Sequence, residues 1–219
     1  MALKAFRTGI LVSPDWLNRI FGVGDPVKVL DCSWHLPNTG RNAREEYARQ
    51  HIPGALFFDI DECADKTSDL PHMLPKPADF AEYVQTLGIN NKSLIVAYDN
   101  NPQFGVFSAP RVWWMFRYFG HDNITVLEGG LPKWISDGFD VSDECPTIEE
   151  DEYFFAKPHD NILKRYEDIV GNLSTQKFQL IDARPSGRFK GTAPEPRPGT
   201  VYEKNCYRYH FMYKFTYIS

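Results

Sequence analysis

The sequence has no excess of positive charge and no long apolar run. Lysine and arginine together number 24, against 29 aspartate and glutamate residues, which gives a formal net charge of -5. A nucleic-acid-binding surface normally forms a basic face or stripe, so this balance argues against nucleic acid as a partner. No apolar run approaches the roughly 18–20 residues that a membrane-spanning helix requires. We therefore predict a folded protein with neither a nucleic-acid nor a membrane partner.

Cysteine is scarce and irregularly spaced. The four cysteines, Cys32, Cys63, Cys145 and Cys206, are widely scattered and form no C-x-x-C pair. A disulfide framework needs closer and more regular spacing, so the pattern favours a reducing compartment. The six histidines show no i,i+3 or i,i+4 spacing either. We therefore predict no metal site.

The signatures of nucleotide binding are missing as well. The segment "EGG" at 128–130 follows an apolar run, but it lacks the G-x-G-x-x-G fingerprint and the lysine and hydroxyl of a P-loop. We interpret it as a turn after a strand. With the metal pattern also absent, the sequence predicts no cofactor.

The N-terminal segment gives only a weak indication of localisation. Its first fourteen residues carry Lys4 and Arg7 and no acid, which is compatible with a mitochondrial presequence but short and poor in arginine. The expected location stays open between the cytoplasm and the mitochondrion.

The residues that are abundant predict an α/β fold. Hydrophobic residues make up 42% of the chain and aromatic residues 15%, enough to bury a core. Ser13 and Pro14 are typical of a helix start, and the apolar segment 27–34 then predicts a strand. A helix starting at Pro77, a strand at 94–98, a polar loop and an amphipathic helix follow. Strands that alternate with helices predict a mostly parallel sheet covered by helices on both faces.

An internal repeat indicates two copies of one domain. The segment "YEDIVGNLSTQKFQLIDARP" repeats the helix, loop and strand of "PDWLNRIFGVGDPVKVLDCSW", with Asp182 in the place of Asp31. Between the copies lies an acidic, proline-containing stretch with no clear period, which is typical of a linker. The predicted divisions are a first domain at 1–145, a linker at 146–160, the start of a second domain at 161–199, and a divergent, tyrosine-rich tail at 200–219.

Three motifs carry a family resemblance: "HIPGALFFDID", "SAPRVWWMFRYFGHDNITVLEGGLPKW" and "DARPSGRFKGTAPEPRPG". In this order and spacing, over residues 9–199, the chain resembles the two-domain rhodaneses, the thiosulfate and 3-mercaptopyruvate sulfurtransferases. The resemblance implies a rhodanese-like first domain that is non-catalytic. It also implies a second domain whose loop cysteine takes sulfane sulfur from a small-molecule donor as a persulfide and passes it to a thiophilic acceptor.

The resemblance places Asp99 at the first domain's equivalent of the cysteine position. A carboxylate supplies the negative charge that loop N–H groups favour, but a hard oxygen cannot carry a transferable sulfur atom. We therefore expect a structural anion; the alternative is a solvated loop aspartate that caps one backbone N–H. In the second copy the same loop would fall at about position 250, beyond the 219 residues of this chain. No cysteine present is predicted to be the nucleophile, so we expect a chain truncated before its catalytic residue and inactive alone.

Two arginines are the candidate substrate-binding residues. Arg188 and Arg197 match, position for position, the pair with which mercaptopyruvate sulfurtransferases hold the carboxylate and keto group of the substrate. Guanidinium groups suit planar oxyanions of this kind. The alternative is that both are solvated loop residues. Arg184 is more typical of a structural ion pair.

Three interpretations of function stay open. The first is a sulfurtransferase of the 3-mercaptopyruvate or thiosulfate type, represented here by an incomplete chain. The second is a non-catalytic binding or regulatory module, whose partner would be a full-length sulfurtransferase. The third is a truncated product without a function.

Overall fold

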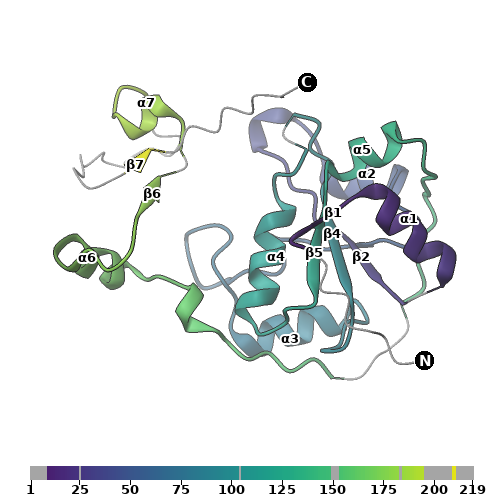
Figure 1. Cartoon of the computed structure of the whole chain (residues 1–219), viewed down its shortest axis with the longest axis horizontal. Coiled ribbons are helices and arrows are strands. Elements are labelled where there is room, and N and C mark those ends of the chain that lie inside the picture. The colour runs from purple at the N-terminus through teal and green to yellow at the C-terminus, as the bar shows by residue number, and fades with distance from the viewer. Residues whose placement is uncertain are drawn as a thin grey trace. The chain divides into compact units, whose positions relative to one another are not determined.

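The computed structural model describes residues 9–24, 26–103, 105–148, 153–182 and 184–194, together with the backbone of a short strand at 209–210. The chain divides into two compact units, Met1–Ile162 and Leu163–Ser219. The first unit contains the purple, blue and teal elements of Figure 1. The predicted linker at 146–160 and the other domain boundaries stay predictions.

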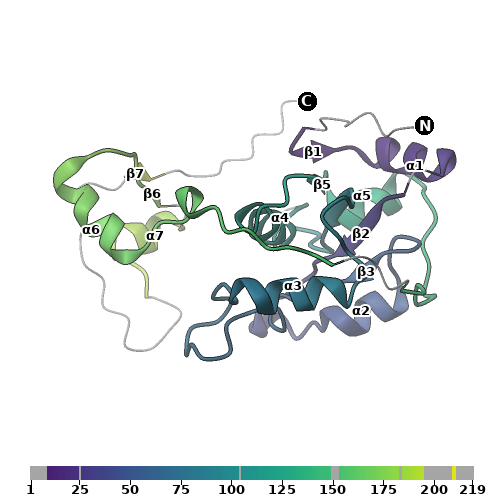
Figure 2. The same cartoon turned by 90° about the horizontal axis from the view of Figure 1, so that it is seen from below.

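The first unit is built on a five-stranded sheet in the order β1-β5-β4-β2-β3. All four strand pairings are parallel. The strands are β1 (Leu11–Val12), β2 (Lys28–Asp31), β3 (Leu56–Phe57), β4 (Ile95–Tyr98) and β5 (Ile124–Leu127). The expected α/β fold with a parallel sheet flanked by helices is confirmed (Figures 1 and 2).

Five α-helices and two short 3₁₀ helices complete the described part of this unit. They are α1 (Pro14–Val23), η1 (Pro37–Thr39), α2 (Ala43–Arg49), α3 (Pro77–Gln85), α4 (Ala109–Tyr118), α5 (Gly130–Ser136) and η2 (Asp160–Ile162). Helix α1 begins as expected, because the Ser13 side chain accepts the N–H of Trp16 at 3.2 Å and Pro14 occupies the first turn. Helix α3 also begins at the predicted proline, Pro77.

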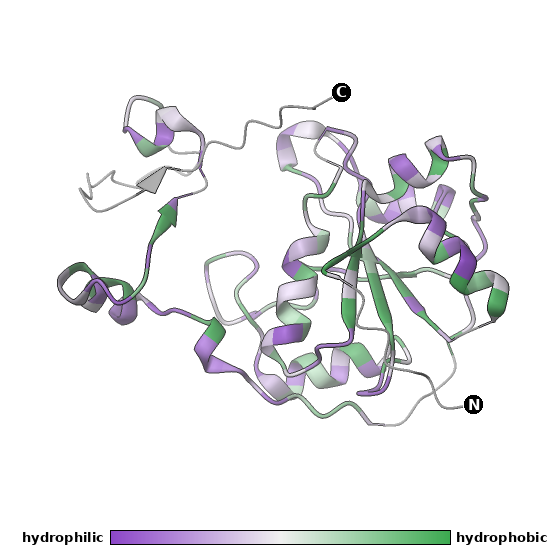
Figure 3. Cartoon of the chain, in the orientation of Figure 1, coloured by the Kyte–Doolittle hydropathy of each residue, from purple (hydrophilic) through white to green (hydrophobic). Residues whose placement is uncertain are grey.

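The central strands β4 and β5 are buried along their whole length, which explains their largely apolar sequences. Val96 and Tyr98 of β4 pack in one buried cluster with Leu17 of α1 and with Leu131 and Trp134 of α5. Because side chains alternate along a strand, the residues between them point to the opposite face, where α4 lies (Figure 1). Figure 3 shows the resulting concentration of hydrophobic residues in the central strands.

The second unit contains α6 (Tyr166–Thr175), β6 (Ile181–Asp182), α7 (Ser186–Phe189) and β7 (Tyr209–His210). Strands β6 and β7 pair in parallel. Asn172 ties α6 to the following turn, because its side chain both donates to and accepts from the backbone of Phe178, at 2.8 and 3.1 Å. Among the described residues of the chain, no helix is long and apolar enough to cross a bilayer.

Candidate functional site

The strand order creates a switch point between β2 and β4. These two strands are neighbours, but the chain leaves β2 towards β3 and leaves β4 towards β5, on opposite sides. In open parallel sheets, ligands bind outside the carboxyl ends of the strands where the connections diverge in this way. Asp31 ends β2 and Asp99 directly follows β4, so two acidic residues meet at this position.

Asp99 accepts four backbone hydrogen bonds. Its Oδ2 atom accepts the N–H groups of Phe107, Ser108 and Ala109 at 2.6, 2.9 and 2.9 Å, and its Oδ1 atom accepts the N–H of Asn101 at 3.1 Å. We call these four N–H groups the amide cradle. Asp99 is only 1% exposed, and the cradle includes the start of α4, where the helix dipole favours negative charge. The site is therefore an anion-binding loop occupied by the chain's own carboxylate.

Gly130 allows α5 to approach the Asp99 backbone. Leu131 donates its N–H to the Asp99 carbonyl oxygen at 3.0 Å. Gly130 has φ 56°, and a Cβ atom there would lie 2.1 Å from the same oxygen. Only glycine fits this position. The sequence predicts a turn at 128–130, but it gives no sign of this close approach.

Asp31 is as deeply buried as Asp99 but receives less compensation. It is 1% exposed and accepts the N–H of Ser33 at 2.9 Å. Its pKa is raised from 3.8 to about 6 in total: burial is the main cause and the negative charge of Asp99 adds to it, while hydrogen bonds from Ser33 and Tyr98 oppose the change.

A hydrogen-bonded group of Arg41, Glu46 and Asn100, which we call the polar brace, stabilises the loop that follows Asp99. Glu46 accepts two hydrogen bonds from Arg41, at 2.9 and 2.6 Å, and one from the Asn100 side chain at 3.1 Å. Arg41 also donates to the Asn100 carbonyl oxygen at 3.0 Å, and His35 lies 3.1 Å from the Glu46 carboxylate. The hydrogen bond from Arg41 is the main cause that lowers the Glu46 pKa. None of these partners follows from sequence spacing.

An aromatic cluster adjoins the amide cradle. Trp34 donates its backbone N–H to the Ser108 hydroxyl at 3.2 Å and its indole N–H to Asp61 at 2.9 Å. Its ring stacks with Phe107 and meets His72 edge-on, at centroid distances of 6.4 and 4.8 Å. The sequence does not predict this cluster, because its members come from loops far apart along the chain.

The environments of the two buried cysteines do not favour a nucleophile. Burial, together with the charges of Asp31 and Asp99, raises the pKa of Cys32 well above its usual value. Burial raises the pKa of Cys63 to about 12. Such thiols are protonated at neutral pH and react slowly. Cys145 is exposed, and Cys206 lies outside the described residues.

The structure places one of the two candidate substrate-binding arginines. Arg188 lies in α7, where its N–H donates to the Pro185 carbonyl oxygen at 3.0 Å. Arg197 lies outside the described residues, so the pairing of the two stays a prediction. Arg184 forms the structural ion pair that its sequence context suggests, with a 2.6 Å contact to Asp182. Within the described ranges, no group of three or more metal-ligating side chains comes together.

Comparison with known proteins identifies the family. The model of the rhodanese-like domain matches residues 13–137. The chain belongs to the rhodanese family. It is 46% identical over 201 residues to the 3-mercaptopyruvate sulfurtransferase of Rattus norvegicus, covering 90% of this chain and 66% of that protein. It is 49% identical over 189 residues to the thiosulfate sulfurtransferase of Bos taurus, covering 85% of this chain and 63% of that protein.

Solved structures agree with this assignment. SseA from Escherichia coli, a 3-mercaptopyruvate sulfotransferase of the rhodanese fold, superimposes with a TM-score of 0.79 at 35% identity, covering 93% of this chain and 74% of SseA. This rhodanese chain spans about two thirds of the length of the curated relatives named above, 66% of the rat protein and 63% of the bovine one.

Proposed function

We propose that this rhodanese chain is part of a sulfurtransferase of the 3-mercaptopyruvate or thiosulfate type, in which the first unit is non-catalytic. The observation that carries the proposal is the occupied amide cradle at the switch point. Four backbone N–H groups converge on the Asp99 carboxylate, at the place where a rhodanese cysteine would stand. The same donors would stabilise a thiolate, but a carboxylate cannot form the persulfide that sulfur transfer requires.

The second unit would supply the residues that bind the sulfur donor. Sulfur transfer would proceed through a cysteine persulfide, and Arg188 and Arg197 would hold the oxyanion of the donor. Guanidinium groups form charge-assisted hydrogen bonds of about 1.5–3 kcal/mol with such groups when water is excluded. The high sequence identity to sulfurtransferases of both types supports a small-molecule sulfur donor.

The chain by itself is expected to transfer no sulfur. The buried thiols of Cys32 and Cys63 are protonated at neutral pH, so neither presents a thiolate to a donor. Purified chain, supplied with thiosulfate and cyanide or with 3-mercaptopyruvate and dithiothreitol, should form no product above background. Turnover that survives replacement of all four cysteines by serine would refute the assignment of a cysteine nucleophile.

Placing a thiol in the amide cradle is expected to create sulfur uptake. In Asp99→Cys, the thiolate would attack the outer sulfur of thiosulfate; the S–S bond breaks and sulfite leaves with the electron pair. Cyanide would then remove the outer persulfide sulfur as thiocyanate and regenerate the thiolate. Mass spectrometry should detect one added sulfur on Asp99→Cys and none on the matched Asp99→Ser variant. A folded Asp99→Cys protein that gains no sulfur would contradict the equivalence of the two positions.

A non-catalytic docking module is the second candidate. The first unit has a five-stranded sheet and a site occupied by its own Asp99 carboxylate, and neither feature requires chemistry within this chain. A full-length sulfurtransferase is the proposed partner. Pull-down with such an enzyme should recover the complex at micromolar concentrations, and its absence there would remove this candidate.

A further inference from the structure

The segment 153–160, which we call the strap, packs along one end of the rest of the first unit. Its backbone forms four hydrogen bonds there. Phe155 exchanges two with the Asn91 side chain, at 2.7 and 3.1 Å, while Lys157 and His159 donate to the carbonyl oxygens of Phe119 and Tyr118 at 2.9 and 2.7 Å. Gly120 makes room for the crossing, because a Cβ atom there would lie 2.8 Å from the Lys157 oxygen.

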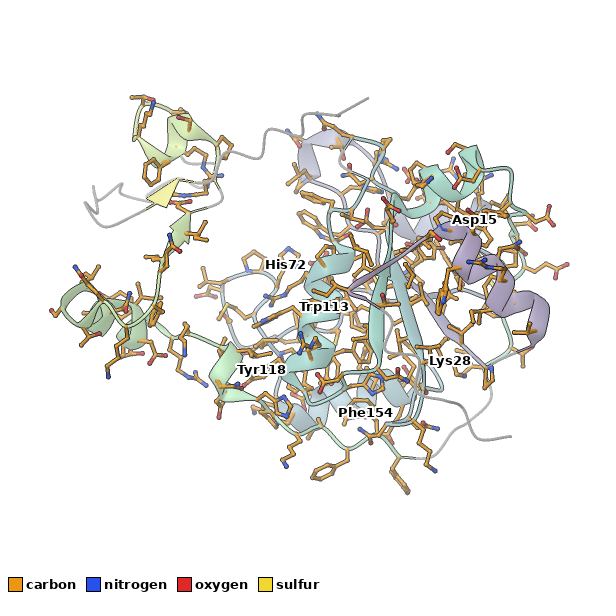
Figure 4. All side chains as sticks on the ribbon, viewed as in Figure 1. Asp15, Lys28, His72, Trp113, Tyr118 and Phe154 are labelled. Carbon is orange, nitrogen blue, oxygen red and sulfur yellow. The ribbon has the colours of Figure 1, made fainter. Side chains whose placement is uncertain are left out.

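A single side chain anchors the strap in the core. Phe154 is 4% exposed, whereas its neighbours Tyr153 and Phe155 are 89% and 74% exposed. Its ring lies 5.7 Å from that of Phe80 and 5.8 Å from that of His121, measured between centroids. Figure 4 labels both Phe154 and Tyr118, the last residue of α4. The strap therefore depends on one aromatic pocket and a few hydrogen bonds at the surface.

His121 forms one wall of this pocket and has an unsatisfied nitrogen. It is 2% exposed, and its Nε2 atom has no hydrogen-bond partner among the described residues. Burial lowers its pKa, while backbone groups of Asn123 and Ser93 and the charge of Asp122 oppose the change. A protonated imidazole carries an N–H on both nitrogens, so the charged form would leave a buried donor unpaired.

Within the described part of the chain, no neighbouring group fully compensates the positive charge that a protonated His121 ring would carry. Charged or titratable groups on the surrounding elements are Asp79, Glu82 and Tyr83 of α3, Arg117 and Tyr118 of α4, Asp122 before β5, Lys92 in the turn before β4, and Lys157, His159 and Asp160 of the strap. Asp122 is the carboxylate whose charge acts on His121, and it already pairs with Arg117 at 3.2 Å. On its other side the ring meets Phe116 at 5.7 Å.

We propose that the strap is a pH-sensitive clasp: protonation of His121 makes the aromatic pocket unfavourable for Phe154, and residues 153–160 detach from the rest of the first unit. Moving the other ring that contacts His121 would cost more free energy. Phe116 is fully buried in α4, which packs on the sheet, whereas the strap is held at the surface and can open locally. Detachment admits water to the charged imidazole.

The pH dependence has a definite sign. The neutral form of His121 is favoured in the folded protein, so the clasp is fully stable above the usual histidine pKa of about 6.5. Stability of the closed clasp is lost as the pH falls from about 6.5 towards the lower pKa of the folded state. We therefore expect the strap to be bound at pH 7.5 and partly detached at pH 5.5.

Hydrogen exchange, corrected for intrinsic rates, tests the clasp directly. Between pH 7.5 and 5.5, protection of the Lys157 and His159 amides should fall several-fold, while the Val96 amide of β4 should not follow. In His121→Asn this pH dependence should disappear, whereas in His159→Gln it should persist. Phe154→Ala should expose both amides at either pH, and the matched Phe155→Ala should not.

Two results would contradict the proposal that the strap detaches when His121 is protonated. The first is strap protection in the natural sequence that does not change over this pH range. The second is a pH dependence that persists in folded His121→Asn. Should that variant fail to fold, an NMR titration of the His121 ring in the unmodified protein decides, because protonation and loss of strap protection must share one midpoint.

Discussion

Asp99→Ala is expected to lower the free energy of unfolding of the first unit by about 3–5 kcal/mol. The variant removes the acceptor of four N–H groups at a site where the side chain is 1% exposed. Each buried donor left without a partner costs about 1–3 kcal/mol, and water entering the vacated space recovers part of this. Urea unfolding, with the transition followed by tryptophan fluorescence, measures the loss.

Two variants separate the loss of the anion from the loss of any aspartate. Asp99→Asn keeps an oxygen for some of the N–H groups but presents an amide nitrogen to others, so a smaller loss is expected. Asp69→Ala changes an aspartate in a loop outside the cradle and should shift stability by no more than about 0.5 kcal/mol. If Asp99→Ala were as stable as Asp69→Ala, the carboxylate would not be the group that organises the loop.

Much of the fold follows from local sequence patterns. Ser13 and Pro14 fix the start of α1, Pro77 fixes the start of α3, and the apolar segment 94–98 is long enough only for a buried strand. These signals depend on neighbouring residues, so they can be read without coordinates. The order of the strands depends on long-range pairing and cannot be read in the same way.

The candidate site was predictable in part for the same reason. The strand, polar loop and helix around Asp99 indicate a carboxylate near a helix start, and the family resemblance gives the position its meaning. The approach of Gly130 and the brace at Glu46 could not be predicted, because they join segments far apart in the sequence. The strap shows the same limit: composition indicates a linker at 146–160, but the burial of Phe154 is a property of the folded core.

Asp31→Asn is expected to stabilise the first unit at pH 7 by up to about 3 kcal/mol. The pKa of Asp31 is about 6 in the folded protein, against 3.8 without burial. A neutral carboxyl is therefore favoured by the fold, and its contribution is fully present below pH 3.8 and lost as the pH rises through 6. A difference of about two pKa units corresponds to roughly 3 kcal/mol. Asparagine stays neutral at every pH, so it avoids this loss.

The shape of the pH profile decides whether this account of Asp31 is right. Denaturant unfolding at pH 4, 5, 6 and 7 should show the variant and the natural sequence nearly equal at pH 4 and diverging as the pH rises. The amide oxygen of the Asp31→Asn side chain can still accept the Ser33 N–H, so the hydrogen bond that measures 2.9 Å in the natural sequence is kept. A loss of stability at pH 7, with no dependence on pH, would mean that the Asp31 charge is needed rather than opposed.

The same substitution at Asp99 is expected to have the opposite effect, which makes the two acids a matched pair. Both are 1% exposed and lie at the ends of neighbouring strands. Four backbone N–H groups compensate the charge of Asp99. Asp31 accepts one backbone N–H and hydrogen bonds from the Ser33 and Tyr98 side chains, and it also faces the negative charge of Asp99. Burial alone therefore does not decide whether a carboxylate stabilises this rhodanese unit; the hydrogen-bond donors and the neighbouring charges decide together.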